Sequence, residues 1–248
     1  MDGLRSKISN VQLERVKRLL LLYEQGLIPT LAEHEVNPGL PLSCRENYLY
    51  FTLPVCINFQ RSSPALRSAA LATYEDKLTR YVFFPERLAQ TPPGKIQADL
   101  LKHKLALQPT KHTLIWTTIA ATLHEFYEDD PRKIVAEAST DAGQLITLLQ
   151  KTHRKRFPYL SGPKLSNYWP FILAQYTDVQ FKNAEAISII PDTHVLKSSA
   201  RLGITTDNAT PLEVEVAWKA LLQGSGITPS RVHPVLWNWS RNKFLPEV

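Results

Sequence analysis

One stretch towards the end of the sequence reads Ile189-Ile-Pro-Asp-Thr-His-Val-Leu-Lys-Ser-Ser-Ala-Arg-Leu-Gly203. Its apolar start ends at a proline, and the spacing then predicts a helix over 192–202. Asp192 stands at the expected N-cap, where a carboxylate accepts backbone N–H groups and complements the helix dipole. Gly203 follows at the position where a glycine commonly ends a helix. Two interpretations of Asp192 are open: a structural cap, or a carboxylate mounted rigidly for chemistry.

A second stretch places basic residues ahead of a glycine turn and reads Phe157-Pro-Tyr-Leu-Ser-Gly-Pro-Lys-Leu-Ser-Asn-Tyr-Trp169. It joins a basic helix expected over 141–155 to another expected over 164–176. A tight turn between two helices can aim backbone N–H groups outward, an arrangement that suits one phosphate. The cations before the turn would add attraction to a nucleic-acid backbone. The alternative is an ordinary packing unit of two helices.

Helical periodicity dominates the chain from residue 96 onward, and further helices are expected over 10–25 and 64–78. Capping residues followed by proline mark other helix starts, at Asp130, Thr210 and Thr228. The apolar aromatic run over 48–59 fits a short strand or a buried extended segment. The expected fold class is therefore mainly α.

The composition limits the partners and cofactors. The chain has 248 residues and a net charge of +6, which favours a polyanion as partner, although many metabolic enzymes are as basic. The two cysteines cannot supply four ligands to zinc or to an iron–sulfur cluster, so no metal and no cofactor is expected. Neither a membrane span nor a signal peptide is recognisable, which predicts a cytoplasmic, nucleoid-associated protein.

Three segments together resemble the helix–hairpin–helix (HhH-GPD) DNA glycosylase superfamily. The stretch from Asp192 to Gly203 resembles its catalytic-aspartate segment, and Leu160-Ser-Gly-Pro-Lys-Leu-Ser-Asn167 resembles its hairpin. His233-Pro-Val-Leu-Trp-Asn-Trp-Ser-Arg-Asn242 resembles its late helix. The segments occur in family order and span roughly residues 97–242.

The resemblance implies two helical subdomains with a cleft between them. On this basis residues 98–190 form the hairpin subdomain, and 191–248 carry the catalytic aspartate and join residues 1–97 in the second. The implied partner is damaged double- or single-stranded DNA, and the implied activity is an N-glycosylase with a possible AP lyase step. The hairpin has one glycine where the family usually has two, the four-cysteine iron–sulfur loop is absent, and residues 177–188 are expected to be an insertion.

The resemblance also implies roles for single residues. Asp192 would be the catalytic carboxylate, and Lys164 the amine nucleophile, with a phosphate contact or a solvated lysine as the alternative. The expected nucleic-acid contacts are Gly162, Ser161, Lys155, Arg156, Lys197 and Arg241. The candidates for a base pocket are Trp169, Tyr168, Trp116 and His194, for each of which a packing role is the alternative.

Two other functions stay open on the sequence. The single-glycine hairpin and the modest charge fit an N-glycosidic hydrolase of a modified nucleoside or nucleotide, similar to the queuosine-salvage relatives of DNA glycosylases. A nucleic-acid-binding module that has the fold without the reaction is the third hypothesis, because fold alone does not fix activity.

Overall fold

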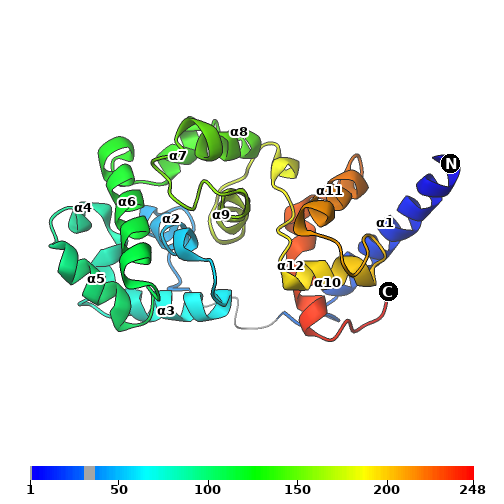
Figure 1. The fold of residues 1–248 in the computed structure, drawn as a ribbon, viewed down its shortest axis with the longest axis horizontal. Helices are drawn as coiled ribbons and strands as arrows, with labels where there is room; N and C mark the ends of the chain where they lie inside the picture. The colour runs from blue at the N-terminus through cyan, green and yellow to red at the C-terminus, as the bar shows by residue number, and fades with distance from the viewer. Residues whose placement is uncertain (1, 31–36) are drawn as a thin grey trace. The chain divides into compact units, whose positions relative to one another are not determined.

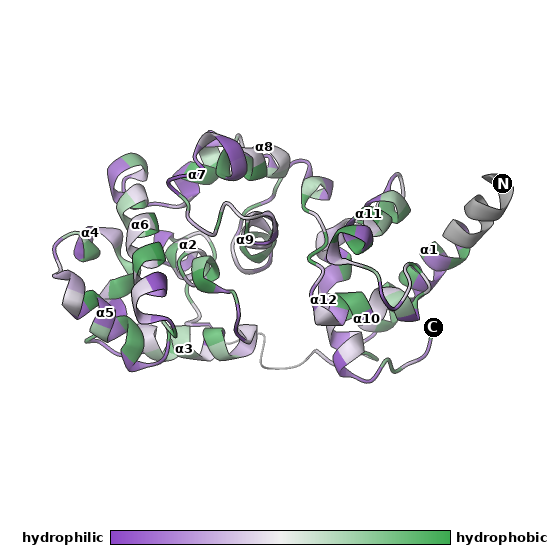
Figure 2. Cartoon of the chain, viewed as in Figure 1, coloured by the Kyte–Doolittle hydropathy of each residue, from purple (hydrophilic) through white to green (hydrophobic). Residues whose placement is uncertain are grey.

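The structure is a computed structural model that describes residues 2–30 and 37–248, with side chains from residue 10 onward. The described residues are mainly helical (Figure 1). Their one β-bridge, between Asp141 and Lys182, is isolated. The chain divides into two compact units, residues 1–31 with 184–248, called unit 1, and residues 32–183, called unit 2. The helices of both units carry hydrophobic and hydrophilic residues together (Figure 2), as helices with one buried face do.

Unit 2 contains the following helices in chain order: α2 (Arg45–Thr52), η2 (Pro54–Ile57), α3 (Ser63–Glu75), η3 (Arg80–Phe83), α4 (Pro85–Leu88), α5 (Pro93–Lys102), α6 (Pro109–Tyr127), α7 (Arg132–Glu137), α8 (Ala142–Thr147), the π-helix η4 (Leu148–Thr152) and α9 (Pro163–Tyr176). Two fully buried tryptophans join these helices through their indole N–H groups. Trp116 of α6 donates to the carbonyl of Val82 at 2.8 Å, and Trp169 of α9 donates to Oγ1 of Thr52 at 3.0 Å.

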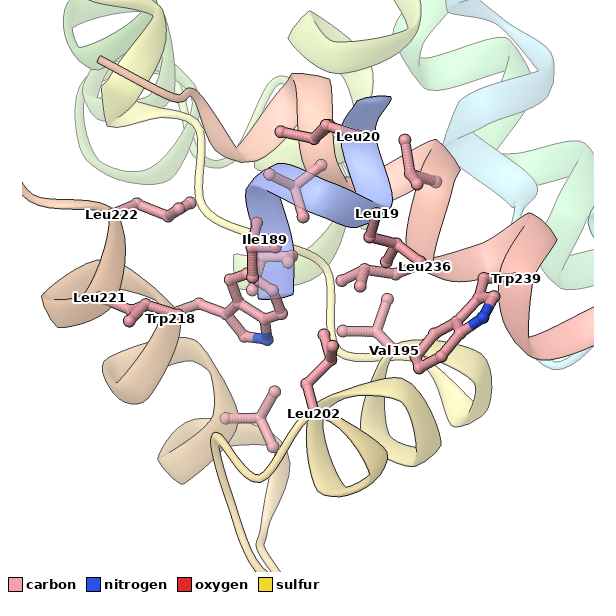
Figure 3. Close-up of a cluster of buried hydrophobic side chains, with 14 of the residues drawn as sticks. Leu19, Leu20, Ile189, Val195, Leu202, Trp218, Leu221, Leu222, Leu236 and Trp239 are labelled. Carbon is pink, nitrogen blue, oxygen red and sulfur yellow. The ribbon is translucent and has the colours of Figure 1, made fainter. Parts of the chain in front are cut away.

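Unit 1 contains α1 (Asp2–Glu24), η5 (Ala184–Ala186), α10 (Thr193–Arg201), α11 (Pro211–Leu222) and α12 (Pro229–Arg241). Buried side chains of the four α-helices converge on one core, among them Leu19, Val195, Trp218 and Leu236 (Figure 3). Hydrogen bonds tie α10 to two of these helices: Ser198 Oγ donates to the carbonyl of Leu236 in α12 at 2.9 Å, and Trp218 of α11 donates from its indole N–H to Ser199 Oγ at 2.7 Å. This packing fixes α10, and with it the residues at its N-terminus.

Two expectations differ from the structure. Residues 48–59 are largely helical, since α2 and η2 cover most of them, so neither a strand nor an extended segment is correct. The expected second subdomain contained all of residues 1–97, whereas the helices α2 to α5 belong to unit 2 together with the hairpin. The reason is their packing: Asn47 of α2 donates to the carbonyl of Tyr176 in α9 at 2.7 Å. Residues 1 and 31–36 of that expected region lie outside the described part of the chain.

Candidate functional site

Asp192 is the N-cap of α10. Its Oδ1 atom accepts hydrogen bonds from the backbone N–H groups of His194 and Val195, both at 2.9 Å. No group in the described residues is bonded to Oδ2, and the side chain is half-buried. The carboxylate therefore has one oxygen fixed by the helix and the other available.

Two residues expected at the site, His194 and Arg241, belong to unit 1. His194 follows Asp192 by two positions in α10, and Arg241 ends α12. His194 is half-buried, its Nδ1 lies 3.1 Å from Oγ of Ser240, and burial lowers its pKa while the nearby Asp192 carboxylate opposes that shift. Its ring lies 5.0 Å from that of Trp237, which the guanidinium of Arg241 also contacts, at 4.6 Å. Unit 1 thus brings His194 and Arg241 to the same indole.

The hairpin is the turn between η4 and α9. The turn is closed by a hydrogen bond from the N–H of Gly162 to the carbonyl of Tyr159 at 2.9 Å. A Cβ atom at Gly162 would lie 3.0 Å from that carbonyl oxygen, so any larger residue would need the carbonyl to move by a few tenths of an ångström. Tyr159 itself adopts a left-handed conformation, with φ of 63°.

The N-terminus of α9 is uncapped. Gly162 offers no capping side chain, and no acceptor among the described residues takes the backbone N–H of Lys164 or Leu165. Lys164 and Lys155 are exposed, Ser161 is half-buried, and the guanidinium of Arg156 lies 3.7 Å from the centre of the Phe126 ring. Unit 2 therefore gathers free N–H groups and cations at the hairpin, which is the chemistry that binds a phosphate backbone. Lys197, in contrast, is an exposed residue of unit 1.

Two of the base-pocket candidates are core residues instead. Trp116 and Trp169 are 0% exposed, and each indole N–H already has a partner within unit 2. Neither has a free face on which a base could stack. Tyr168 is half-buried and lines a small cavity with Arg67, and His194 is half-buried, so these two stay candidates.

Sequence reasoning gave no role to Tyr159, although the structure makes it an exposed aromatic residue at the hairpin. It is 41% exposed and stacks on Phe59, with the ring centres 4.4 Å apart. No local sequence signal could have identified it, because its partner Phe59 lies 100 residues earlier in the chain.

The donor groups do not fit an iron–sulfur cluster. Cys44 is the N-cap of α2, and the buried Cys56 donates from Sγ to the carbonyl of Thr52. Within residues 10–30 and 37–248, no group of three His, Cys, Asp or Glu side chains could hold a metal ion. No helix in the described ranges is both long and apolar enough to span a membrane.

Unit 1 also has a cavity of about 520 Å³ between the segment 185–189 and the loop that joins α11 to α12. Trp218, Leu222 and Ile227 line it, and Asp192 does not. The cavity is therefore separate from the carboxylate.

A search of solved structures finds this fold in a trapped covalent intermediate of endonuclease III with DNA, an estranged-adenine complex. The TM-score is 0.54 at 16% sequence identity, and the match covers 93% of this chain and 86% of that chain. No family model matches the sequence, and no curated protein does. Sequence identity this low indicates a shared fold but not a shared activity, so the similarity concerns the architecture alone. The chain therefore has the mainly helical fold of endonuclease III.

Proposed function

We propose that this protein is a DNA N-glycosylase that removes a damaged base. The observation that carries the proposal is the Asp192 carboxylate, held at the N-terminus of α10 by two backbone N–H groups. The fold supports it, because the neighbour endonuclease III was trapped as a covalent intermediate with DNA. The cations and free N–H groups at the hairpin also support it, since a DNA enzyme must hold the phosphate backbone.

The chemistry assigned to Asp192 is electrostatic. When the bond between C1′ and the base breaks, the base leaves with the electron pair and positive charge develops on the sugar. A carboxylate already fixed in place stabilises that charge without reorganisation. Since Oδ1 is occupied by two N–H groups, we assign Oδ2 to the sugar or to the attacking water. Water adds to C1′, its proton passes to the carboxylate, and the departing base takes a proton from solvent.

Lys164 is proposed as the amine of an additional lyase step. Its neutral amine would attack C1′, displace the base, and form a Schiff base from which the strand is cleaved by elimination. The side chain is exposed beside the uncapped start of α9, and no described carboxylate forms an ion pair with it. A lysine so placed could equally serve as a phosphate contact, so its role has a separate test.

Replacing Asp192 with Asn tests the carboxylate. Asparagine is as good an N-cap as aspartate, so the free energy of unfolding should change little. Base release from duplexes that carry uracil, 8-oxoguanine, hypoxanthine or an alkylated base should fall by at least about 100-fold. Asp141→Asn is the matched control, because Asp141 caps α8 in the same way by accepting from the N–H of Gln144 at 2.9 Å. Full activity of Asp192→Asn would refute the proposal.

Borohydride trapping on a duplex with an abasic site tests Lys164. A covalent adduct should form with the wild type and with Lys182→Ala, whose lysine is also exposed in unit 2, and disappear with Lys164→Ala. Base release without an adduct would remove Lys164 from the mechanism and leave a monofunctional glycosylase. Release from free modified nucleosides, with none from DNA, would instead support the nucleoside hydrolase.

A further inference from the structure

A stack of two aromatic rings stands beside the hairpin of unit 2. The rings of Phe59 and Tyr159 lie almost parallel, with an angle of 12° and 4.4 Å between their centres. Phe59 is half-buried, and its ring also contacts the ring of His112 at 5.0 Å in an edge arrangement. Tyr159 uses one face for Phe59, and its hydroxyl has no hydrogen-bond partner among the described residues.

The ammonium group of Lys111 leaves the outer face of Tyr159 open. Its Nζ lies 5.0 Å from the ring centre of Phe59 and 4.8 Å from that of Tyr159. These nearly equal distances place it close to the plane midway between the two rings, beside the stack and not on top of it. An outward aromatic face with a cation at its side is therefore exposed to solvent.

The backbone at Tyr159 is strained, with φ of 63°. A non-glycine residue in the left-handed region costs about 1–2 kcal/mol, and glycine would close the same turn without that cost. The turn itself consequently does not call for tyrosine. Strained backbone conformations cluster at functional sites, which points to a function for the Tyr159 ring.

The charge around the stack is positive. Arg61 donates from Nη1 to the carbonyl of Leu105 at 2.6 Å and from Nη2 to that of Lys104 at 3.2 Å, and no described carboxylate pairs with it. Burial lowers the pKa of His112, and the cations of Arg61 and Lys111 lower it further, with no acidic group acting in the opposite direction. The surroundings thus favour an anionic ligand that also has a flat, polarisable part.

We infer that Phe59, Tyr159 and Lys111 form a stacking platform for an unpaired base of the bound DNA strand, called here the Tyr159 platform. The inference rests on the proposed function. The carbonyl of Tyr159 is bonded to the N–H of Gly162, so the platform adjoins the free N–H groups that start α9. A strand whose phosphate lies at that helix start would place a neighbouring base on the ring, while Lys111 meets its backbone. Stacking on a tyrosine face is independent of base identity.

Two single-stranded probes of equal length test the platform, oligothymidylate and the same strand with abasic residues at its centre. Tyr159→Gly removes the ring and eases the turn, and it should weaken binding of oligothymidylate about tenfold while leaving the abasic strand unaffected. The slope of affinity against salt should not change, because no phosphate contact is lost. Tyr159→Phe should bind as the wild type does. Lys111→Ala should flatten the slope by about 0.7 on both probes.

Tyr81→Leu is the matched control, since Tyr81 also has a lysine at its ring, Lys95 at 5.2 Å, elsewhere in unit 2. Equal binding of oligothymidylate by wild type and Tyr159→Gly, or an equal loss on both probes, would overturn the platform. So would failure of the wild type to bind either strand. If base release depends on Asp192 but Tyr159→Gly has no effect, the proposed function stands and the platform fails. If Tyr159→Gly weakens binding of oligothymidylate but no base is released, the platform stands and the proposed function fails.

Discussion

At the scale of single residues, burial and hydrogen-bond partners distinguish a core side chain from a candidate site residue, whereas the residue type does not. The sequence contains five tryptophans, and the family resemblance made Trp116 and Trp169 candidates for a base pocket. Both are core residues because neighbouring segments, far away in the sequence, supply acceptors for their N–H groups. Tyr159 is the reverse case, because nothing in the local sequence indicates that Phe59 will lie under its ring.

The buried imidazole of His112 makes a prediction about pH. Its Nδ1 accepts the backbone N–H of Leu107 at 3.1 Å, which requires the neutral ring, and burial with two nearby cations lowers its pKa in the folded state. Below the unfolded value of about 6.5 the unfolded chain therefore binds more protons, so the free energy of unfolding should fall as the pH drops, by up to about 1.4 kcal/mol per unit.

Urea unfolding between pH 7.5 and 5.0 measures this dependence. His112→Asn keeps an acceptor for the N–H of Leu107 and cannot titrate in this range, so it should lose stability less steeply than the wild type on acidification. Identical pH profiles for the two proteins would show that His112 does not contribute.

At the scale of secondary-structure elements, helix starts were the most predictable feature. Proline fixes the backbone angle of a first turn, and a preceding polar residue can satisfy the free N–H groups, so both act within a few residues of sequence. The helices α9, α10, α11 and α12 begin within one residue of the expected positions. Residues 48–59 were misjudged because a short apolar run looks alike in a strand and in a buried helix.

The two Thr-Pro helix starts of unit 1 provide a matched pair. Thr210 forms a capping box with Glu213, accepting from its backbone N–H at 3.3 Å, whereas Thr228 makes no capping bond and its hydroxyl lies 3.0 Å from that of Ser230. Thr210→Ala should therefore cost about 1 kcal/mol of stability in urea unfolding, and Thr228→Ala clearly less. A larger loss in Thr228→Ala would show that the capping box does not stabilise α11.

At the scale of the whole molecule, the sequence predicted a mainly helical chain, and the fold agrees with that prediction. It did not predict which helices share a core. The assignment of α2 to α5 depends on contacts such as that between Asn47 and the carbonyl of Tyr176, and a contact across more than a hundred residues leaves no periodic trace. The N-cap position of Asp192 was predicted because its signal is local, whereas the contacts among Phe59, Lys111 and Tyr159 were not predicted because they join three distant segments.

The discontinuous make-up of unit 1 fixes an order of events during synthesis. Unit 2 is one continuous segment, so the ribosome has delivered all of it before α10 is made, and such segments can fold as they emerge. Leu19 of α1 emerges first, but its core partners Trp218 and Leu236 come near the end. A nascent chain halted before α12 would thus possess the hairpin and its cations while the support of Asp192 is incomplete. Under the proposed function, the capacity to hold DNA would arise earlier on the ribosome than the capacity to release a base from it.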